Sequence, residues 1–428
     1  MKPKRKRWGI GLSIFLSIVF LLGAINPLST NITLTEVPYP MDYSNQAGWW
    51  SPLETYGSTK EYAYLVYNAP GSTNDKHTVK IAKRDGCGNW SNLPIMDGNT
   101  AVEYPDDLGH NQPSMARDGD GYFHVFASMH NNSWRYFRSD QVGSAPQNHS
   151  DELPDSNLTF TYPIVATAPN GDLYLIARAS ENDRRSGRLY HWDNKLKSWK
   201  RVAIFASESK KSVYPNDIQV DAAGNVHILF EWSTYPSSGL RHELSYLKYS
   251  PSTGKFYKAD NTPVSAPVTT ATADVIQPLA TTEQYIRDYG DPGGPGVQSG
   301  KLTLDHNNQP QIVYRYRSPY SGSIFTIQYA YFRNGQWQRE TAHSSTQTKV
   351  AVDITWDGTK SRVYYVLSSG PDRVFATTKD SRTWTPISLA PGKPIERLAV
   401  EQNANGTDIL YLVDSRNLKL YYGRFSVD

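Results

Sequence analysis

The sequence is short of cysteine and of helical periodicity. Cys87 is the only cysteine among 428 residues, so an intrachain disulfide is impossible and any zinc site would depend on His, Asp or Glu. No long segment has the apolar spacing of an amphipathic helix, which argues against a helical solenoid. Stability must therefore come from packed strands, and 29 tyrosines and 11 tryptophans favour that conclusion.

Basic residues are concentrated at the N-terminus. Five of them lie within residues 2–7, and removing five positive charges turns the formal net charge of +3 into −2. The remaining chain lacks the lysine- and arginine-rich surface that binds phosphate backbones, so we expect no nucleic-acid partner. A local cationic pocket is still compatible with this balance.

The N-terminal segment resembles an export signal. The basic residues are followed by an apolar run at residues 10–25, which Asn26-Pro27 ends before the roughly 20 residues of a membrane span. We expect residues 1–28 to be an export signal or a short N-terminal anchor, and this segment to be the only contact with a membrane. The protein is then secreted, periplasmic or on the cell surface.

A turn followed by a strongly β-prone run recurs seven times. The runs are residues 61–68, 122–128, 173–178, 226–232, 310–316, 362–369 and 409–415. Six of them follow turns with Gly or Asn, and most of these turns lie about 50 residues apart, the length of one four-stranded propeller blade. The pattern predicts an all-β protein, a seven-bladed β-propeller that forms a single domain over residues 29–428.

Two further segments complete this prediction. One interval between turns is 84 residues long and contains an insertion at about residues 258–300, whose Gly- and Pro-rich end at residues 287–300 we expect to be a surface loop. The last repeat has only three strand-like segments. Residues 31–37 would supply its fourth strand and close the ring.

Six side chains are predicted to converge on one rim of the propeller. Neighbouring strands of a blade are antiparallel, so a residue that begins the first strand and one that ends the second lie on the same face. Three consecutive repeats have such residues at similar distances from their turn glycines. His110, Tyr162 and Tyr214 come before the turns, and His130, Arg178 and Trp232 come after them. None is a carboxylate, whereas ordinary glycosidases use a pair of them.

This set suits β-elimination at a uronic acid. Arg178 could pair with the carboxylate of the sugar, and Tyr214 could add a hydrogen bond. A neutral histidine can remove the C5 proton, and a tyrosine, protonated at neutral pH, can donate to the departing O4. Trp232 would be a wall of the groove or a platform for sugar stacking.

Structural explanations exist for the same residues. His110 could cap its turn, Tyr162 and Tyr214 could be packing residues at strand starts, and Arg178 could pair with a nearby acid at 181 or 183. His124 and His227 lie in mid-strand, where we expect them to be core residues.

The segments around these residues resemble the BNR-type propeller family that includes ulvan lyases. The likeness rests on HNQPSMARDGDGYFHV from His110, on HNN from His130, on the Tyr162-Pro163 pair with Arg178, and on RHELSYLKYS at residues 241–250. Residues 378–384, TKDSRTW, are close to the Asp-box turn of BNR repeats. The resemblance implies that His110 is the base and Tyr162 the acid, that Arg178 and Tyr214 neutralise the carboxylate, and that His130 assists.

The resemblance also implies an acidic, ulvan-like polysaccharide as substrate and no cofactor in catalysis. Asn111 and His242 lie in the matching segments, and we assign them to substrate binding. No metal ligand is assigned, and a structural metal is left open. Two alternatives remain at this point: a non-catalytic glycan-binding propeller, and a glycoside hydrolase of the α-L-rhamnosidase type.

Overall fold

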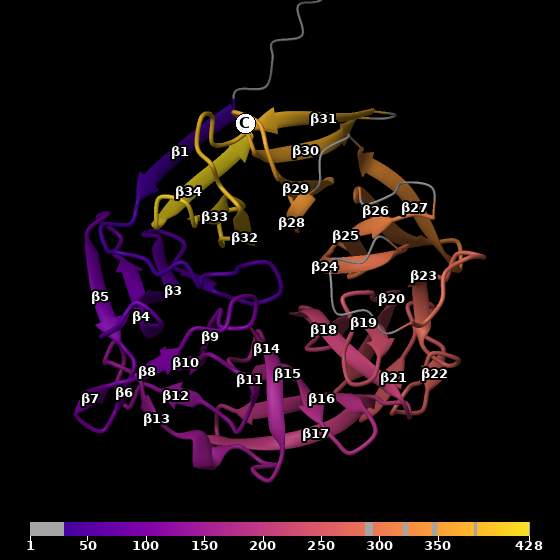
Figure 1. Ribbon diagram of the computed structural model, residues 1–428, viewed down its shortest axis with the longest axis horizontal. Coiled ribbons are helices and arrows are strands. Elements are labelled where there is room, and N and C mark those ends of the chain that lie inside the picture. Colours follow the sequence, from indigo (N-terminus) through magenta and orange to yellow (C-terminus); the bar gives the residue numbers. More distant parts are fainter. Residues whose placement is uncertain (1–29, 287–293, 320–323, 345–348, 381–382, 428) are drawn as a thin grey trace, which may run out of the picture.

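The computed structural model describes residues 30–286, 294–319, 324–344, 349–380 and 383–427 as a ring of β-sheets around a central axis (Figure 1). One short 3₁₀ helix (Ser150–Glu152) is the only helix in these ranges. No helix of the described residues is long and apolar enough to cross a membrane. The expected export signal, residues 1–28, lies outside the described residues.

The strands form six hydrogen-bonded sheets, and three of these have four strands each. In hydrogen-bonded order they are β1 (Thr30–Glu36), β34 (Lys419–Val427), β33 (Asp408–Asp414) and β32 (Arg397–Gln402); β24 (Gly296–Leu304), β25 (Pro310–Arg317), β26 (Thr326–Arg333) and β27 (Gln336–His343); and β28 (Lys349–Trp356), β29 (Ser361–Leu367), β30 (Val374–Asp380) and β31 (Thr383–Ser388).

The other three sheets are larger. The five-stranded sheet contains β2 (Leu53–Tyr56), β3 (Tyr62–Pro70), β4 (Lys76–Arg84), β5 (Trp90–Pro94) and β8 (Glu103–Pro105). The six-stranded sheet contains β6 (Met96–Asp97), β7 (Thr100–Ala101), β9 (Ser114–Arg117), β10 (Phe123–Phe126), β12 (Tyr136–Arg138) and β13 (Gln147–Asn148). The eleven-stranded sheet contains β11 (His130–Asn132), β14 (Thr159–Thr167), β15 (Leu173–Ser180), β16 (Arg185–Asp193), β17 (Ser198–Ala206), β18 (Lys211–Val220), β19 (Val226–Thr234), β20 (His242–Ser250), β21 (Lys255–Tyr257), β22 (Pro263–Val264) and β23 (Asp274–Gln277).

All seven β-prone runs of the sequence lie in strands, namely β3, β10, β15, β19, β25, β29 and β33. The eleven-stranded sheet contains two of them, and its two antiparallel groups are joined by one parallel pair, Arg185 with Ser212. The prediction of an all-β, propeller-like protein is confirmed. The count of seven blades stays a prediction.

The two ends of the described chain meet in one sheet. β1 pairs antiparallel with β34 from Thr30 opposite Val427 to Glu36 opposite Tyr421, so indigo and yellow ribbons lie side by side in Figure 1. The predicted pairing of residues 31–37 with the last repeat is therefore confirmed. Ile32 and Leu34 of β1 pack against the apolar cluster that includes Leu410 and Phe425 of that sheet.

The prediction that residues 287–300 form a surface loop is wrong for their last part. Residues 296–300 begin β24, and most of them are buried. The glycines are required by close packing, because a Cβ at Gly296 would lie 2.5 Å from the carbonyl oxygen of Arg241 and one at Gly300 would lie 2.7 Å from Leu229. Residues 287–293 lie outside the described residues.

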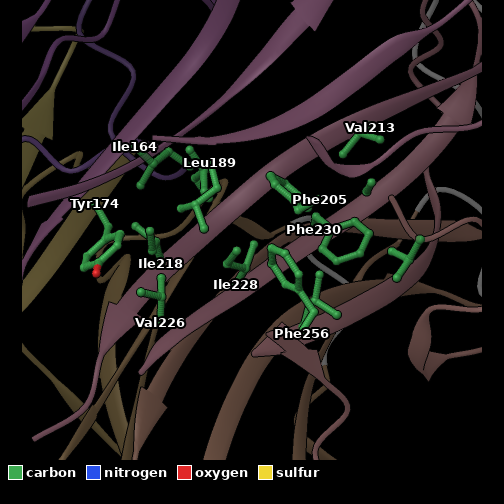
Figure 2. Packing of buried hydrophobic residues seen from close by; sticks show 14 of the residues in the cluster. Ile164, Tyr174, Leu189, Phe205, Val213, Ile218, Val226, Ile228, Phe230 and Phe256 are labelled. Carbon is green, nitrogen blue, oxygen red and sulfur yellow. The ribbon is translucent and has the colours of Figure 1, made fainter. Parts of the chain in front are cut away.

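The two antiparallel groups of the eleven-stranded sheet pack against each other through apolar side chains. In the largest cluster, Phe205 and Phe230 cross edge to face with centroids 5.3 Å apart, and Ile164 and Ile228 are almost fully buried nearby (Figure 2). Such burial compensates for the missing disulfides. His227 is 1% exposed and bonds Asp221 and Tyr246, so its prediction as a core residue is confirmed.

The innermost strands surround a cavity of about 400 Å³ and are tied to one another by buried carboxylates. Asp217 accepts a hydrogen bond from the Leu302 amide at 2.8 Å, and Asp353 accepts one from Val400 at 2.7 Å. Glu401 accepts one from Thr55 at 3.2 Å. These bonds link β18 to β24, β28 to β32, and β32 to β2.

Candidate functional site

Two Tyr-Pro pairs lie at irregularities of inner strands. In β14 the pairing with β15 shifts between Thr161 and Ile164, and Tyr162 has a φ of 57°. Proline has no amide hydrogen for the ladder, so Pro163 favours the bulge that turns the tyrosine out of the alternating pattern. β18 has the same irregularity after Tyr214-Pro215. The bulges bring the two tyrosine rings to 5.6 Å from each other.

His110 and His130 form a stacked pair that shares one carboxylate. Their rings lie 3.6 Å apart with an interplanar angle of 9°. Nδ1 of His110 is 3.0 Å from one oxygen of Asp107, and Nδ1 of His130 is 2.5 Å from the other. An ionised carboxylate only accepts hydrogen bonds, so Nδ1 of each histidine carries a proton and donates it to Asp107.

Electrostatics favours the neutral form of His110. Burial and the neighbouring His130 lower the pKa of His110 to about 4, although Asp107 acts in the opposite direction. The pKa of Asp107 is also lowered, because the hydrogen bonds from the two histidines outweigh its partial burial. A neutral imidazole beside an ionised carboxylate is the arrangement that a general base requires.

Arg178 lies between the two tyrosine rings without an acidic partner. Its guanidinium carbon is 4.7 Å from the centroid of Tyr162 and 4.6 Å from that of Tyr214. The side chain is 1% exposed, and its Nε and Nη1 atoms are buried without a hydrogen-bond partner. The expected pairing with Glu181 or Asp183 is not found among the contacts of the described residues, since these acids bind Arg188 and Arg184.

A second arginine completes a ring of side chains around this position. Arg241 lies 4.2 Å from the centroid of Tyr214 and 4.7 Å from that of Trp49, and Trp49 packs against Tyr162 at 6.1 Å. Arg241 also pairs with the buried Glu231 at 3.2 Å. We call Trp49, Tyr162, Arg178, Tyr214 and Arg241 the aromatic-arginine ring.

The two tyrosines differ in acidity. Burial raises the pKa of Tyr162, which is also 5.8 Å from the ring of His110. Burial acts on Tyr214 in the same direction, but Arg178 and Arg241 outweigh it and lower the pKa of Tyr214. Tyr162 is thus suited to keep and donate a proton, and Tyr214 to stabilise charge beside Arg178.

The structure brings together five of the predicted site residues, namely His110, His130, Tyr162, Arg178 and Tyr214. One other assignment is wrong. Trp232 is fully buried in the core and donates to Ser245, because the residue opposite Tyr214 is Glu231 and alternation turns Trp232 to the other side of β19.

Asn111 and His242, the other two residues assigned to substrate binding, are buried in hydrogen-bonded positions. The backbone carbonyl oxygen of Asn111 accepts a hydrogen bond from Asn68. His242 bonds Glu283 of the insertion at 2.5 Å. Their assignment to substrate binding stays a prediction.

Sequence reasoning missed Asp107, Trp49, Arg241 and Glu231. Asp107 could have been found from its spacing of three residues before His110. Glu231 directly precedes the wrongly chosen Trp232. A prediction with the strand register shifted by one residue would therefore have placed Glu231 in the site. Trp49 lies in an arm between β1 and β2 that belongs to no repeat, and no sequence signal placed it here.

Asp107, His110 and His130 are also the group of described residues whose donor atoms could hold a metal ion, since these atoms lie within 4.8 Å of one another. Two imidazoles and one carboxylate suit a divalent transition metal. The same atoms already satisfy one another by hydrogen bonds. The expectation that catalysis needs no metal stays a prediction.

Comparison with known proteins places the chain in a family. The model of the BNR repeat-containing family matches residues 47–345, well over half of the sequence. The chain belongs to the BNR repeat-containing family. The matched residues include the aromatic-arginine ring and the histidine pair. No curated protein matches the chain.

Solved structures with a similar fold include polysaccharide lyases. The crystal structure of the polysaccharide lyase Uly1 has a TM-score of 0.67 and 13% sequence identity, over 91% of this chain and 92% of that one. An ulvan lyase of family PL25 has a TM-score of 0.63 and 14% identity, over 91% and 95%. The latter enzyme bound to -[GlcA(1-4)Rha3S]- has a TM-score of 0.59. At this identity the likeness shows the fold of this BNR-family chain and not its activity.

Proposed function

We propose that this BNR-family protein is a polysaccharide lyase that cleaves uronic-acid linkages by β-elimination. Arg178 carries the proposal, because a buried guanidinium with two unpartnered nitrogens needs acceptor groups, and a carboxylate offers two of them together with the opposite charge. A uronate carboxylate supplies two acceptor oxygens in the geometry of such a fork. The polysaccharide lyases among the similar structures support the same reaction class.

In the proposed reaction, Arg178 and Tyr214 bind the carboxylate and stabilise negative charge that develops as the C5 proton leaves. The Nε2 atom of His110 takes that proton, and the C5 electron pair forms the C4–C5 double bond. The C4–O4 bond breaks, and the Tyr162 hydroxyl donates its proton to the departing O4. His130 assists by sharing Asp107 with His110 and thereby holding its ring.

Binding must involve a local shift of side chains. Arg178 is 1% exposed and the two tyrosines are each 4% exposed, whereas the side chains of His110 and His130 are 26% and 31% exposed. A sugar therefore meets the histidine side of the site first. Its carboxylate reaches Arg178 only when the rings over the guanidinium move.

The proposed substrate is an acidic, ulvan-like polysaccharide of rhamnose and uronic acid. The support comes from the cationic ring and from a similar structure bound to -[GlcA(1-4)Rha3S]-. We further propose seven blades, with the eleven-stranded sheet counted as two, and export of the protein to the cell surface, the periplasm or the medium. No cofactor is used in the proposed mechanism.

Incubation with ulvan and with other uronic polymers tests the activity. A lyase gives products with a 4,5-unsaturated uronate, which absorbs in the ultraviolet. New reducing ends without unsaturated ones would point instead to a hydrolase, and binding without any new ends would point to a non-catalytic glycan-binding protein. Either result contradicts the proposal.

A further inference from the structure

The arm between β1 and β2 brings an aromatic side chain to the site from outside the sheets. This arm, residues 37–52, reaches toward the middle of the ring in Figure 1. The Gln46 amide donates to Gln112 at 2.7 Å, and the Ser51 amide donates to Ser114 at 3.1 Å. The acceptors lie two and four residues after His110, so the arm is fixed to the segment that carries the proposed base.

The two tryptophans of the arm have different environments. Trp50 is 1% exposed, and its carbonyl oxygen accepts a hydrogen bond from Lys301 at 3.4 Å. Trp49 is half-buried. Trp50 therefore anchors the arm, while Trp49 stays partly exposed.

Within the aromatic-arginine ring, Trp49 is the member that a ligand meets first. The exposed fractions of the other four members are 8% for Arg241, 4% for each tyrosine and 1% for Arg178. Arg241 lies over the indole of Trp49, and its aromatic neighbours Trp50 and Tyr162 approach at 70° and 53°. Neither of these rings stacks in parallel on the indole and covers it.

We propose that Trp49 is the stacking platform for a pyranose ring of the bound polysaccharide, and that it determines how the uronate is aligned with Arg178 and His110. This inference rests on the proposed function for the identity of the glycan. The apolar C–H face of a pyranose packs on a flat indole, and the fixed arm holds that indole in place without the glycan. Trp49 thus has the role that the sequence assigned to Trp232.

The test measures glycan binding without turnover. In a Tyr162→Phe background, the Kd for ulvan oligosaccharides is measured by calorimetry for Trp49→Leu and Trp49→Phe. Leucine keeps apolar volume over Arg241 but has no flat ring, so Kd should rise about tenfold, the effect of one lost stacking contact. Phenylalanine should restore most of the affinity. With Tyr162 intact, Trp49→Leu should raise KM by a similar factor and also lower kcat, because the uronate is no longer held in line with Arg178 and His110.

Trp90→Leu is the matched control, because Trp90 is also half-buried and crosses another ring, Tyr422, at 5.9 Å on a sheet outside the site. Its Kd should equal that of the parent. An unchanged Kd for Trp49→Leu, or an equal rise for Trp90→Leu, overturns the platform. Because binding is measured in a variant that does not cleave the glycan, these results are separate from the failure of the lyase proposal. That failure would show as an absence of unsaturated ends with the wild-type protein.

Discussion

Replacement of Tyr162 by phenylalanine separates catalysis from packing at this site. The ring is 4% exposed and packs against Trp49, Trp50 and Tyr214, and phenylalanine keeps all of these contacts. Only the proton donor for the departing O4 is lost. A general acid contributes about 10² to 10⁴ in rate, which corresponds to about 3 to 5 kcal/mol of transition-state stabilisation. We expect kcat on ulvan to fall by that factor while the melting temperature stays nearly constant.

The assay is the initial rate of formation of unsaturated ends, with thermal melting of the same preparations. Tyr190→Phe is the matched control, since Tyr190 is a fully buried tyrosine near β14 whose hydroxyl donates to Asp155 at 2.9 Å. It should lose about 1 kcal/mol of stability and keep its turnover. A near-normal rate for Tyr162→Phe would refute the reasoning and make Tyr162 a packing residue.

Four further outcomes are expected. Arg178→Ala should cost about 3 to 4 kcal/mol of transition-state stabilisation, and His110→Ala should lower kcat at least about a hundredfold, both measured as unsaturated ends. Burial raises the pKa of Asp353 to about 7, so the folded state holds a proton that the unfolded chain releases above about pH 4. The free energy of unfolding should therefore fall by up to about 1.4 kcal/mol per pH unit between about pH 4 and pH 7 and then level off. Asp353→Asn should flatten the pH profile of the melting temperature. Deletion of residues 1–36 removes β1 and should lower the melting temperature, whereas an unchanged melt would show that β1 does not stabilise the ring.

The repeat pattern allowed most of the strands to be predicted, because each repeat carries its own turn and β-prone run. Turn carboxylates show why this works: Asp221 accepts a hydrogen bond from the Asn225 amide at 2.8 Å, and Asp305 accepts one from Gln309 at 2.9 Å. These contacts are local in sequence. The start of β24 was missed, because its glycines are selected by close approach to Arg241 and Leu229, which are distant in the chain.

The site was predictable where it follows the repeat and not elsewhere. Tyr162 and Arg178 were found because they occupy corresponding positions in adjacent strands. The assignment of Trp232 to the site was wrong, because the bulge after Tyr214 places Glu231 and not Trp232 opposite Tyr214. Trp49 could not be placed, since its arm crosses to the site through hydrogen bonds to Gln112 and Ser114 that no local pattern encodes.

We propose that this protein breaks a uronic-acid linkage by elimination rather than by hydrolysis. The most direct measurement is the ratio of unsaturated uronate ends to new reducing ends during digestion of ulvan, with the first determined by NMR and the second by reducing-sugar assay. Elimination predicts one unsaturated end for every new reducing end. New reducing ends with no unsaturated uronate would contradict the account.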